Sequence, residues 1–401
     1  MSDRKHEEET PAAPEEGLSP EARRELAEVL EGMERLSRLI QQRESFRAGP
    51  VTFKFLRVLE ERKNGVQLLL FERSLPRGMA GHVVVKRLQS PRRSELRQRL
   101  KEEVQLAFRL HHPAIAQVHH FKVFGGSPYV VMEYVAGPLL ESLLSTAALR
   151  RQPLPAPFAL YVAAEVADAL DYAHTLTDRE DGGRPLGIIH RDVSPRNIRV
   201  GRRCGEVKLT DFGAAYSKRV GRLETPELLK KGDLLYASPE YLLGLPMDAR
   251  SDVFSLGLVL LEALTSHHLF DGEQEEVSAS SSGREVRADE APPLPLERML
   301  ARVERYGPED VERAAAGLPE GLAALLRKAL QRDPARRHAT VGELRRELLA
   351  QLAALAPSYG RKDAAEEVER LIRDASALRD VGEPVEGGLY PELLDSDEAE
   401  G

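Results

Sequence analysis

The chain has 401 residues and a formal net charge of −8, from 57 Lys and Arg against 65 Asp and Glu. This length is sufficient for a large hydrophobic core divided between two or three domains or lobes. The only cysteine, Cys204, excludes an internal disulfide framework and a zinc site built from cysteines. The acidic balance argues against general electrostatic binding of nucleic acid. The longest nearly apolar run, 255–264, is too short to span a bilayer, and the first ten residues lack the apolar segment of a secretion signal, so we expect a cytoplasmic protein.

Two segments precede the first strand-like run. Residues 1–18 are acidic, contain proline and have few large apolar side chains, which is typical of a disordered arm. Residues 19–48 are predicted to form an amphipathic helix that starts at Ser19 as N-cap and Pro20 at the first helical position. Its apolar stripe consists of Leu26, Leu30, Met33, Leu36 and Ile40. This stripe either docks on the chain's own main domain, which we favour, or binds a partner.

The period of the sequence then changes from helix to strand. Three strand-like runs, 51–59, 66–71 and 82–88, are separated by turn residues. A helix is predicted from about 94 to 110, and two more strand-like runs follow at 118–123 and 129–134. The predicted order is therefore three strands, one helix and two strands.

Beyond Gly137-Pro138 the sequence becomes mainly helical. The predicted helices are 157–176, 252–265, 318–331, 341–355 and 362–378, and the short apolar runs 198–200 and 207–209 flank a turn. The helix at 252–265 is apolar nearly all round, which indicates burial. The segment 272–293 is predicted to be a surface loop, and the tail at 394–401 is acidic.

Several short motifs occur in a meaningful order. They are Val83-Val84-Val85-Lys86, His190-Arg191-Asp192 followed five residues later by Asn197, Asp211-Phe212-Gly213, Ser238-Pro239-Glu240, and Asp252 at the start of the buried helix. The set resembles the protein kinase family, specifically the bacterial eukaryotic-like Ser/Thr kinases, over residues 52–352. The resemblance implies an α+β, two-lobed fold: a small antiparallel sheet with one helix (52–136) and a larger helical lobe (137–352). A helix and an acidic tail (356–401) would follow.

The same resemblance implies transfer of the γ-phosphoryl group of ATP, with Mg²⁺, to Ser or Thr hydroxyls of a protein substrate. Phosphoryl transfer requires positioning and charge neutralisation. By resemblance Asp192 is the catalytic base, Asn197 and Asp211 are the metal ligands, and Lys86 binds the α- and β-phosphates. Gly65, Val84 and Glu133 would complete the nucleotide site.

Two further charged residues are assigned around these groups. Glu103 falls within the apolar stripe of the predicted helix whereas Glu102 falls outside it, and a carboxylate that points inward needs a partner. Glu103 is therefore the expected partner of Lys86. Arg196, four residues after Asp192, resembles the tyrosine-kinase arrangement and would supply charge near the γ-phosphate. By resemblance, Arg191 would hold a phosphorylated activation segment (213–239).

By the same resemblance, Glu240 and Arg337 match a buried ion pair of the family, with a structural role. Removing one partner of such a pair would leave the other charge buried and uncompensated.

The nucleotide-binding loop departs from the family pattern. Aligned on Gly65, two of its glycines are absent, and Gln67 takes the place of an apolar residue that covers the adenine. Val84 replaces the usual Ala, and Arg199 replaces the usual Leu below the ring. These departures leave open a second interpretation, a pseudokinase or scaffold with weak or absent ATP turnover. A small-molecule phosphotransferase is a third, which the long activation segment disfavours.

Overall fold

The structure is a computed structural model. It describes residues 45–48, 50–61, 66–76, 78–88, 104, 106–124, 127–178, 182–212, 215, 234–270 and 296–380. The chain divides into two compact units, one made of Met1–Lys101 with His119–Met132 and the other of Glu102–Val118 with Glu133–Gly401. In the described ranges, no helix is both long enough and apolar enough to cross a membrane.

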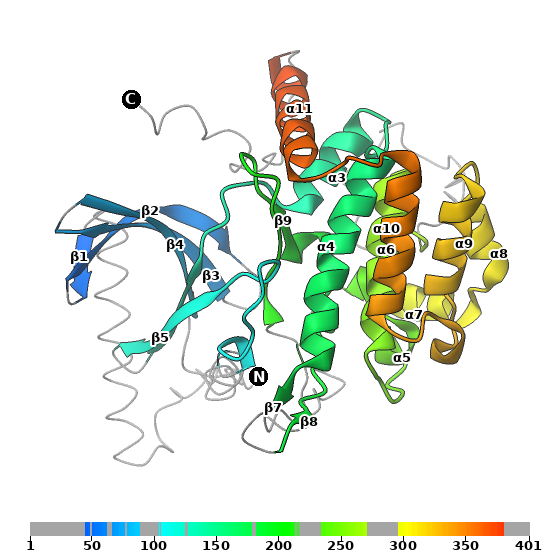
Figure 1. Ribbon diagram of the computed structural model, residues 1–401, viewed down its shortest axis with the longest axis horizontal. Coiled ribbons are helices and arrows are strands. Elements are labelled where there is room, and N and C mark those ends of the chain that lie inside the picture. The colour runs from blue at the N-terminus through cyan, green and yellow to red at the C-terminus, as the bar shows by residue number, and fades with distance from the viewer. Residues whose placement is uncertain are drawn as a thin grey trace, which may run out of the picture. The chain divides into compact units, whose positions relative to one another are not determined.

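The first unit is built on a six-stranded sheet with the order β1-β2-β3-β4-β6-β5 (Figure 1). The strands are β1 (Ser45–Ala48), β2 (Val51–Glu61), β3 (Val66–Leu75), β4 (Gly78–Leu88), β5 (Val118–Phe124) and β6 (Ser127–Glu133). The first four pair antiparallel with their neighbours in sequence. The five predicted strands are thus present, and β1 is an additional edge strand.

Strand β1 corrects the predicted extent of the N-terminal helix. Residues 45–48, the last four of the segment predicted as helix, pair with β2, and Phe46 lies opposite Phe53. Alternating apolar and polar residues in SFRA suit an edge strand as well as a helix end, and pairing with β2 decides between them. The remainder of that segment, the arm before it and the tail at 394–401 lie outside the described residues.

One face of this sheet, which we call the aromatic face, carries a compact apolar cluster. Its members are Phe53, Phe55, Leu69, Phe71, Val83, Val85, Tyr129 and Val131. Phe55 lies opposite Phe71, and their rings meet edge to face with centroids 5.6 Å apart. Because side chains alternate along a strand, Val84 and Lys86 lie on the opposite face.

The second unit is helical and contains two short hairpins (Figure 1). Its helices are α3 (Leu140–Leu149), α4 (Ala156–Thr175), α5 (Pro239–Leu242), α6 (Arg250–Thr265), α7 (Leu296–Arg305), α8 (Pro308–Ala314), α9 (Glu320–Ala329), α10 (Val341–Leu355) and α11 (Arg361–Asp380). The hairpins pair β7 (Thr177–Asp178) with β8 (Arg184–Pro185) and β9 (Ile198–Val200) with β10 (Val207–Leu209). Together with the sheet, this arrangement confirms the predicted α+β architecture.

Helices α4 and α6 form the centre of the second unit's core. Both are buried along most of their length, as the nearly continuous apolar sequence of α6 predicts. Gly257 of α6 lets α9 approach closely, because a Cβ there would lie 3.0 Å from the Leu330 side chain and 3.1 Å from Ala329 Cβ. This packing fixes the N-terminal end of α6, where Asp252 lies.

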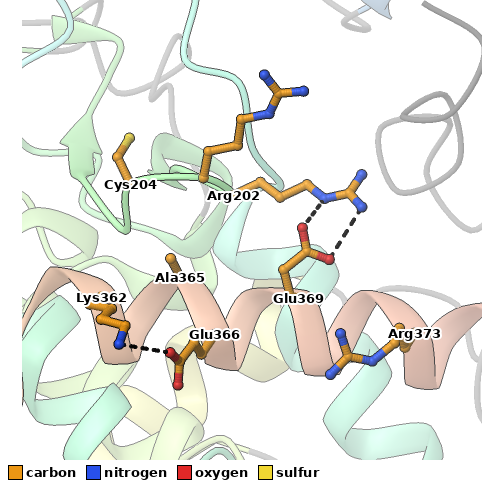
Figure 2. A pocket seen from close by; sticks show the side chains of 8 residues that line it. Arg202, Cys204, Lys362, Ala365, Glu366, Glu369 and Arg373 are labelled. Atoms are coloured by element: carbon orange, nitrogen blue, oxygen red, sulfur yellow. Dashed lines mark hydrogen bonds and ion pairs between the residues drawn. The ribbon is translucent and has the colours of Figure 1, made fainter. Parts of the chain in front are cut away.

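The last helix, α11, is longer than predicted and joins the core. Its apolar residues Ala364, Val368, Leu371, Ile372 and Ala375 are buried in the same cluster as α4 and α6. Its polar side lies against the turn between β9 and β10, where Glu369 pairs with Arg202 (Figure 2). The sequence predicts the helix from its period, but its contacts are long-range and carry no local signal.

Candidate functional site

The segment before Asp192 is fixed by a buried carboxylate. Asp252, in the first turn of α6, is completely buried. Its Oδ2 accepts a hydrogen bond from the His190 backbone N–H at 2.8 Å, and its Oδ1 accepts one from the Arg191 N–H at 2.9 Å. His174 Nε2 of α4 lies 2.7 Å from Oδ2. Asp252 therefore ties α4 and α6 to the two residues that precede the predicted catalytic base.

The charges around Asp252 follow from this geometry. Burial disfavours ionisation of Asp252, but its interactions with His174 and His190, including the His190 backbone N–H, together outweigh burial and hold its pKa below the usual value. Burial also lowers the pKa of His190. Asp252 is thus an anion in the folded protein at neutral pH, and His190 is neutral.

Three of the predicted site residues meet at the open end of the β9–β10 hairpin. Asn197 directly precedes β9, and Asp211 follows shortly after β10. Ile198 of β9 pairs with Leu209 of β10. The Thr210 N–H donates to the Asn197 carbonyl at 2.8 Å, which extends the pairing by one step. Asn197 Nδ2 donates to the Asp192 carbonyl at 2.8 Å. Asp192, Asn197 and Asp211 are therefore brought together within one unit.

The backbone at this end adopts conformations that few residues accept. Arg191 has φ +66° and Asp211 has φ +58°, both in the left-handed region. The neighbouring side chains support this geometry: the His190 ring packs edge to face on Phe212 with centroids 4.5 Å apart, and His190 Nε2 lies 3.2 Å from the Thr210 carbonyl oxygen. Strain of this kind persists only where surrounding contacts impose it, and it is common at functional sites.

Lys86 and Val84 lie on β4 in the sheet unit, on the face opposite the aromatic face. Both are buried. The register pairs Leu68 with Lys86 and Leu70 with Val84, so Val66, two residues before Leu68, shares their face. Val66 is therefore the apolar residue beside Val84 and Lys86.

The position of Gln67 corrects an expectation drawn from aligning the loop on Gly65. Gln67 pairs with Arg87 and lies on the aromatic face, away from Lys86. Arg87 Nε donates to Gln67 Oε1 at 2.8 Å, and Gln67 Nε2 donates to Glu61. Burial lowers the pKa of Arg87, although it stays a cation. Gln67 thus satisfies a buried guanidinium and does not replace an adenine cover.

Arg196 and Glu133 have close ionic partners that the sequence did not indicate. Arg196 is exposed, and its Nε lies 2.6 Å from Glu141 Oε1 of α3. Glu133, at the end of β6, pairs with Lys208 at 2.8 Å, and its Oε2 accepts the Gln117 N–H at 3.0 Å. Both pairs join segments far apart in sequence, so no local pattern could predict them.

Of the remaining predicted positions, Arg199 lies within the described residues. Arg199 of β9 donates from Nη1 to the Gly137 carbonyl at 3.0 Å, which directs its guanidinium to the segment after β6. Glu103, Gly65 and most of the predicted activation segment lie outside the described residues. In the predicted helix 94–110, Val104, Leu106 and Ala107 are helical.

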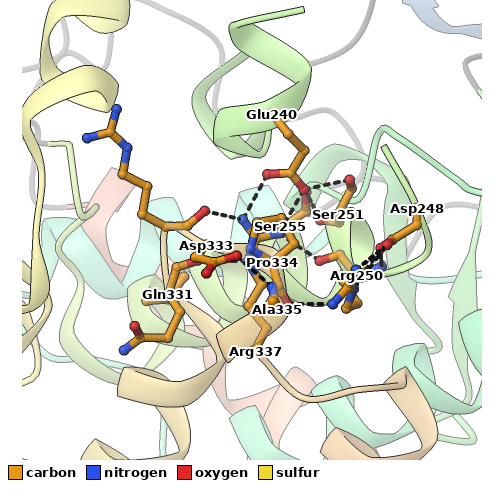
Figure 3. A network of polar contacts seen from close by, with 12 residues as sticks. Glu240, Asp248, Arg250, Ser251, Ser255, Gln331, Asp333, Pro334, Ala335 and Arg337 are labelled. Carbon is orange, nitrogen blue, oxygen red and sulfur yellow. Dashed lines mark hydrogen bonds and ion pairs between the residues drawn. The ribbon is translucent and has the colours of Figure 1, made fainter. Parts of the chain in front are cut away.

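The predicted pair of Glu240 and Arg337 is confirmed (Figure 3). Two parallel hydrogen bonds of 2.8 Å join Arg337 Nη1 and Nη2 to the two Glu240 oxygens. Ser251 Oγ donates to Glu240 Oε1 at 2.7 Å, and the guanidinium lies 4.8 Å from the Phe254 ring centroid. Burial opposes ionisation of Glu240, but Arg337 outweighs it and holds the Glu240 pKa below its usual value. The pair anchors α5, just beyond the predicted activation segment.

The donor set at the hairpin fits Mg²⁺. This cation prefers a carboxylate, other hard oxygens, phosphate oxygens and water. Asp211 supplies a carboxylate. The Asn197 amide nitrogen donates to the Asp192 carbonyl, which leaves the amide oxygen available to a metal ion.

Comparison with known proteins identifies the family. The sequence matches the protein kinase domain model over residues 75–348. The chain belongs to the protein kinase family. Protein kinases use ATP with Mg²⁺, and the side-chain oxygens of Asp211 and Asn197 are of the kind that this metal prefers.

Curated bacterial protein kinases are among its relatives. The chain is 34% identical over 263 residues to the tyrosine-protein kinase MasK of Myxococcus xanthus, an alignment that covers 63% of this chain and 40% of MasK. It is 31% identical over 307 residues to the serine/threonine-protein kinase PknB of Mycobacterium leprae, an alignment that covers 76% of this chain and 43% of that PknB. PknB of Mycobacterium tuberculosis is 35% identical over 256 residues, an alignment that covers 63% of this chain and 35% of that PknB. The chain therefore spans less than half the length of these protein kinases.

Proposed function

We propose that this protein kinase transfers the γ-phosphoryl group of Mg–ATP to Ser or Thr hydroxyls of a protein substrate. The observation that carries the proposal is the meeting of Asp192, Asn197 and Asp211 at the open end of the β9–β10 hairpin. A phosphoryl-transfer site needs a proton acceptor for the attacking hydroxyl and oxygen ligands for the metal. This group of residues contains both.

In this mechanism each side chain has one task. Asp192 orients the substrate hydroxyl and accepts its proton, while Asn197 and Asp211 hold Mg²⁺, which neutralises phosphate charge when bound. Lys86 binds the α- and β-phosphates, and Glu103 orients Lys86. Arg196 adds charge near the γ-phosphate.

The nucleotide itself would be lined by Gly65, Val84 and Glu133. The position of Val66 on the face of Val84 and Lys86 supports adenine binding, because it supplies the apolar contact that Gln67 does not. The match to the kinase domain and the preserved transfer residues give no support to the pseudokinase alternative.

Ser/Thr selectivity is favoured over Tyr selectivity by the PknB relatives, whose names describe serine/threonine kinases. MasK is named a tyrosine kinase, and Arg196 resembles the tyrosine-kinase arrangement. Analysis of the phosphoamino acids formed on a protein substrate separates the two. Phosphoserine or phosphothreonine supports the proposal, and phosphotyrosine alone contradicts it.

Incubation with γ-labelled ATP, Mg²⁺ and casein tests the activity. Wild-type protein should label casein or itself, and Asp211→Ala should reduce the label to background. Asp248→Ala is the matched control, because Asp248 is a half-exposed aspartate that pairs with nearby Arg250 and is not a predicted site residue. Equal label on wild type and Asp211→Ala would exclude catalysis by this site.

We also infer that residues 19–44 cover the aromatic face as a docked helix. The segment enters the sheet through the edge strand β1. Its apolar stripe from Leu26 to Ile40 would span about 21 Å as a helix, close to the width of about 19 Å of four strands. Docking in cis, with autoregulation, is preferred to a separate partner because the segment is covalently held beside this face.

A pair of substitutions tests this docking. Leu30→Asp should lower the free energy of unfolding by about 2 kcal/mol, because it places a charge in the buried stripe. Arg35→Asp introduces the same residue on the opposite side of the predicted helix and should have little effect. Equal stability of the two variants would contradict docking in cis.

We propose a cytoplasmic location for the protein. ATP is available there, and the exposed thiol of Cys204 suits a reducing compartment. We further propose that regulation acts through the activation segment, with Arg191 as the site at which a phosphorylated residue docks.

A further inference from the structure

Helix α11 lies beyond the part of the chain that matches the kinase domain. The match ends at residue 348, within α10, and α11 begins at Arg361. Even so, Ala364 and Val368 of α11 are completely buried in the core of the second unit. The folded catalytic unit therefore extends to about residue 380, past the boundary at 352 expected from the sequence.

The polar side of α11 holds the closed end of the β9–β10 hairpin (Figure 2). Glu369 makes two bonds to Arg202 in the hairpin turn, with Nε–Oε1 at 2.6 Å and Nη2–Oε2 at 3.2 Å. Five residues further along α11, Asp374 pairs with Arg150 at the end of α3. A bidentate arginine–carboxylate pair fixes direction as well as distance.

A glycine in the same turn lets the start of α11 approach. Gly205 has φ +60°, and a Cβ there would lie only 1.9 Å from the Arg361 carbonyl oxygen. The Gly205 carbonyl also accepts a hydrogen bond from the Tyr161 hydroxyl at 2.9 Å. The turn is therefore held between α4 and α11 with no room for a side chain.

The opposite end of this hairpin carries Asn197 and Asp211. Its strands have three residues each, so the two ends are separated by only about 10 Å. Arg202 N–H also donates to the Ala136 carbonyl at 2.9 Å, which ties the turn to the segment that follows Glu133. A displacement of the turn would therefore be transmitted along a short, hydrogen-bonded element to the metal ligands.

We propose that α11 is a brace for the metal-binding hairpin, with Glu369, Arg202 and Gly205 as positioning residues. This inference rests on the proposed roles of Asn197 and Asp211. A solvent-open hollow of about 710 Å³ lies beside the Arg202–Glu369 contact, lined by residues of the turn and of α11. The apolar side of α11 stays anchored in the core, so substitutions at the Arg202–Glu369 pair or at Gly205 disturb the hairpin turn without removing the helix.

Two glycine substitutions form the first test. Gly205→Ala and Gly187→Ala impose the same backbone strain, because φ is +60° at Gly205 and +59° at Gly187. Nothing lies within 4 Å of a Cβ at Gly187, so only Gly205→Ala displaces α11. Hydrogen exchange measured well below the melting temperature should be at least tenfold faster in peptides covering 198–211 of Gly205→Ala, and unchanged in Gly187→Ala.

Charge-neutral variants of α11 give a second, milder test. Glu369→Gln removes the ion pair with Arg202. Glu366→Gln is a control on the same helix, since Glu366 is exposed and pairs with Lys362 of α11 itself at 3.7 Å. Glu369→Gln should weaken Mg²⁺-dependent binding of a fluorescent ATP analogue about three- to tenfold. The double variant Arg202→Glu with Glu369→Arg, which swaps the two charges, should restore Mg²⁺-dependent binding of the analogue.

The outcomes separate this inference from the proposed function. Faster exchange confined to α11, with 198–211 and Mg²⁺-dependent nucleotide binding unchanged in Glu369→Gln, would overturn the brace. Both readouts are independent of phosphoryl transfer, so an inactive wild type would contradict the proposed function and leave the exchange result interpretable.

Discussion

Two buried carboxylates of the helical unit, Asp252 and Glu240, are held in different ways. Glu240 is paired with a guanidinium, and its partners are side chains. Asp252 is bound by two backbone N–H groups next to Asp192 and by one imidazole. The two carboxylates therefore support different parts of the unit. Loss of the cation beside Glu240 leaves an uncompensated buried charge, whereas loss of Asp252 releases the backbone that precedes Asp192, the proposed base.

The largest effect on stability is expected for Arg337→Leu. Glu240 would remain buried without its cation, which costs about 3–5 kcal/mol in the free energy of unfolding. Arg336→Leu is the control, because the neighbouring Arg336 is exposed and lies 3.9 Å from Asp333. Denaturant unfolding of both variants measures the difference, and similar values would show that the buried pair is not a major source of stability.

Asp252→Asn should affect stability less and chemistry more. The amide keeps one acceptor, so one backbone N–H loses its partner at a cost of about 1–3 kcal/mol. Movement of residues 190–192 by about 1 Å would reduce kcat about 100-fold. Arg337→Leu should retain much more of its kcat per folded molecule. If Arg337→Leu lost more kcat per folded molecule than Asp252→Asn, Asp252 would not support the segment at residues 190–192.

The surroundings of the two carboxylates should also respond differently to pH, through His190 beside Asp252 and through Glu240 itself. The lowered pKa of His190 means that its stabilising neutral form is fully present above about pH 6.5. As pH falls below this value the unfolded state takes up a proton first, and stability is lost. The lowered pKa of Glu240 contributes stability above its usual value of 4.5, which is lost only as pH falls further.

Free energies of unfolding measured between pH 7 and pH 5 test whether stability falls as the pH is lowered. Wild type should lose stability over this interval, and His190→Gln should reduce the slope by up to about 1.4 kcal/mol per pH unit. His111→Gln is the control on an exposed histidine. Identical slopes in the two variants would contradict a neutral, buried His190.

The smallest effect on stability is expected for Arg196→Ala. Its pair with Glu141 is exposed, so the free energy of unfolding should change by less than about 0.5 kcal/mol. If Arg196 supplies charge to the γ-phosphate, kcat should fall about tenfold. Glu141→Gln removes the pair but keeps the cation and should preserve kcat. Equal kcat in wild type and Arg196→Ala would remove this residue from the mechanism.

The family was predictable from the sequence because phosphoryl transfer constrains residue types and their order, and the roles of Lys86, Asp192, Asn197 and Asp211 stay predictions. The spacing of apolar residues along the sequence predicted helix α11 and most of the strands. The contacts of Asp252 and Glu369 join distant segments, so the sequence identified Asp252 as a helix start and gave no contact for Glu369.

One prediction about the nucleotide loop was wrong for a physical reason. Aligning on Gly65 shifted β3 by one residue, and in a strand such a shift moves each side chain to the other face. The β3–β4 register restores Val66 to the face of Lys86 and moves Gln67 to Arg87.

Nucleotide affinity with and without Mg²⁺ tests the central claim most directly, because it reports on the proposed metal ligands at the hairpin without requiring a protein substrate. Titration of an ATP analogue should show at least tenfold tighter binding to wild type when Mg²⁺ is present, and Asp211→Asn should lose that difference. Binding that is independent of Mg²⁺ in wild type, or an equal Mg²⁺ effect in Asp211→Asn, would contradict the account.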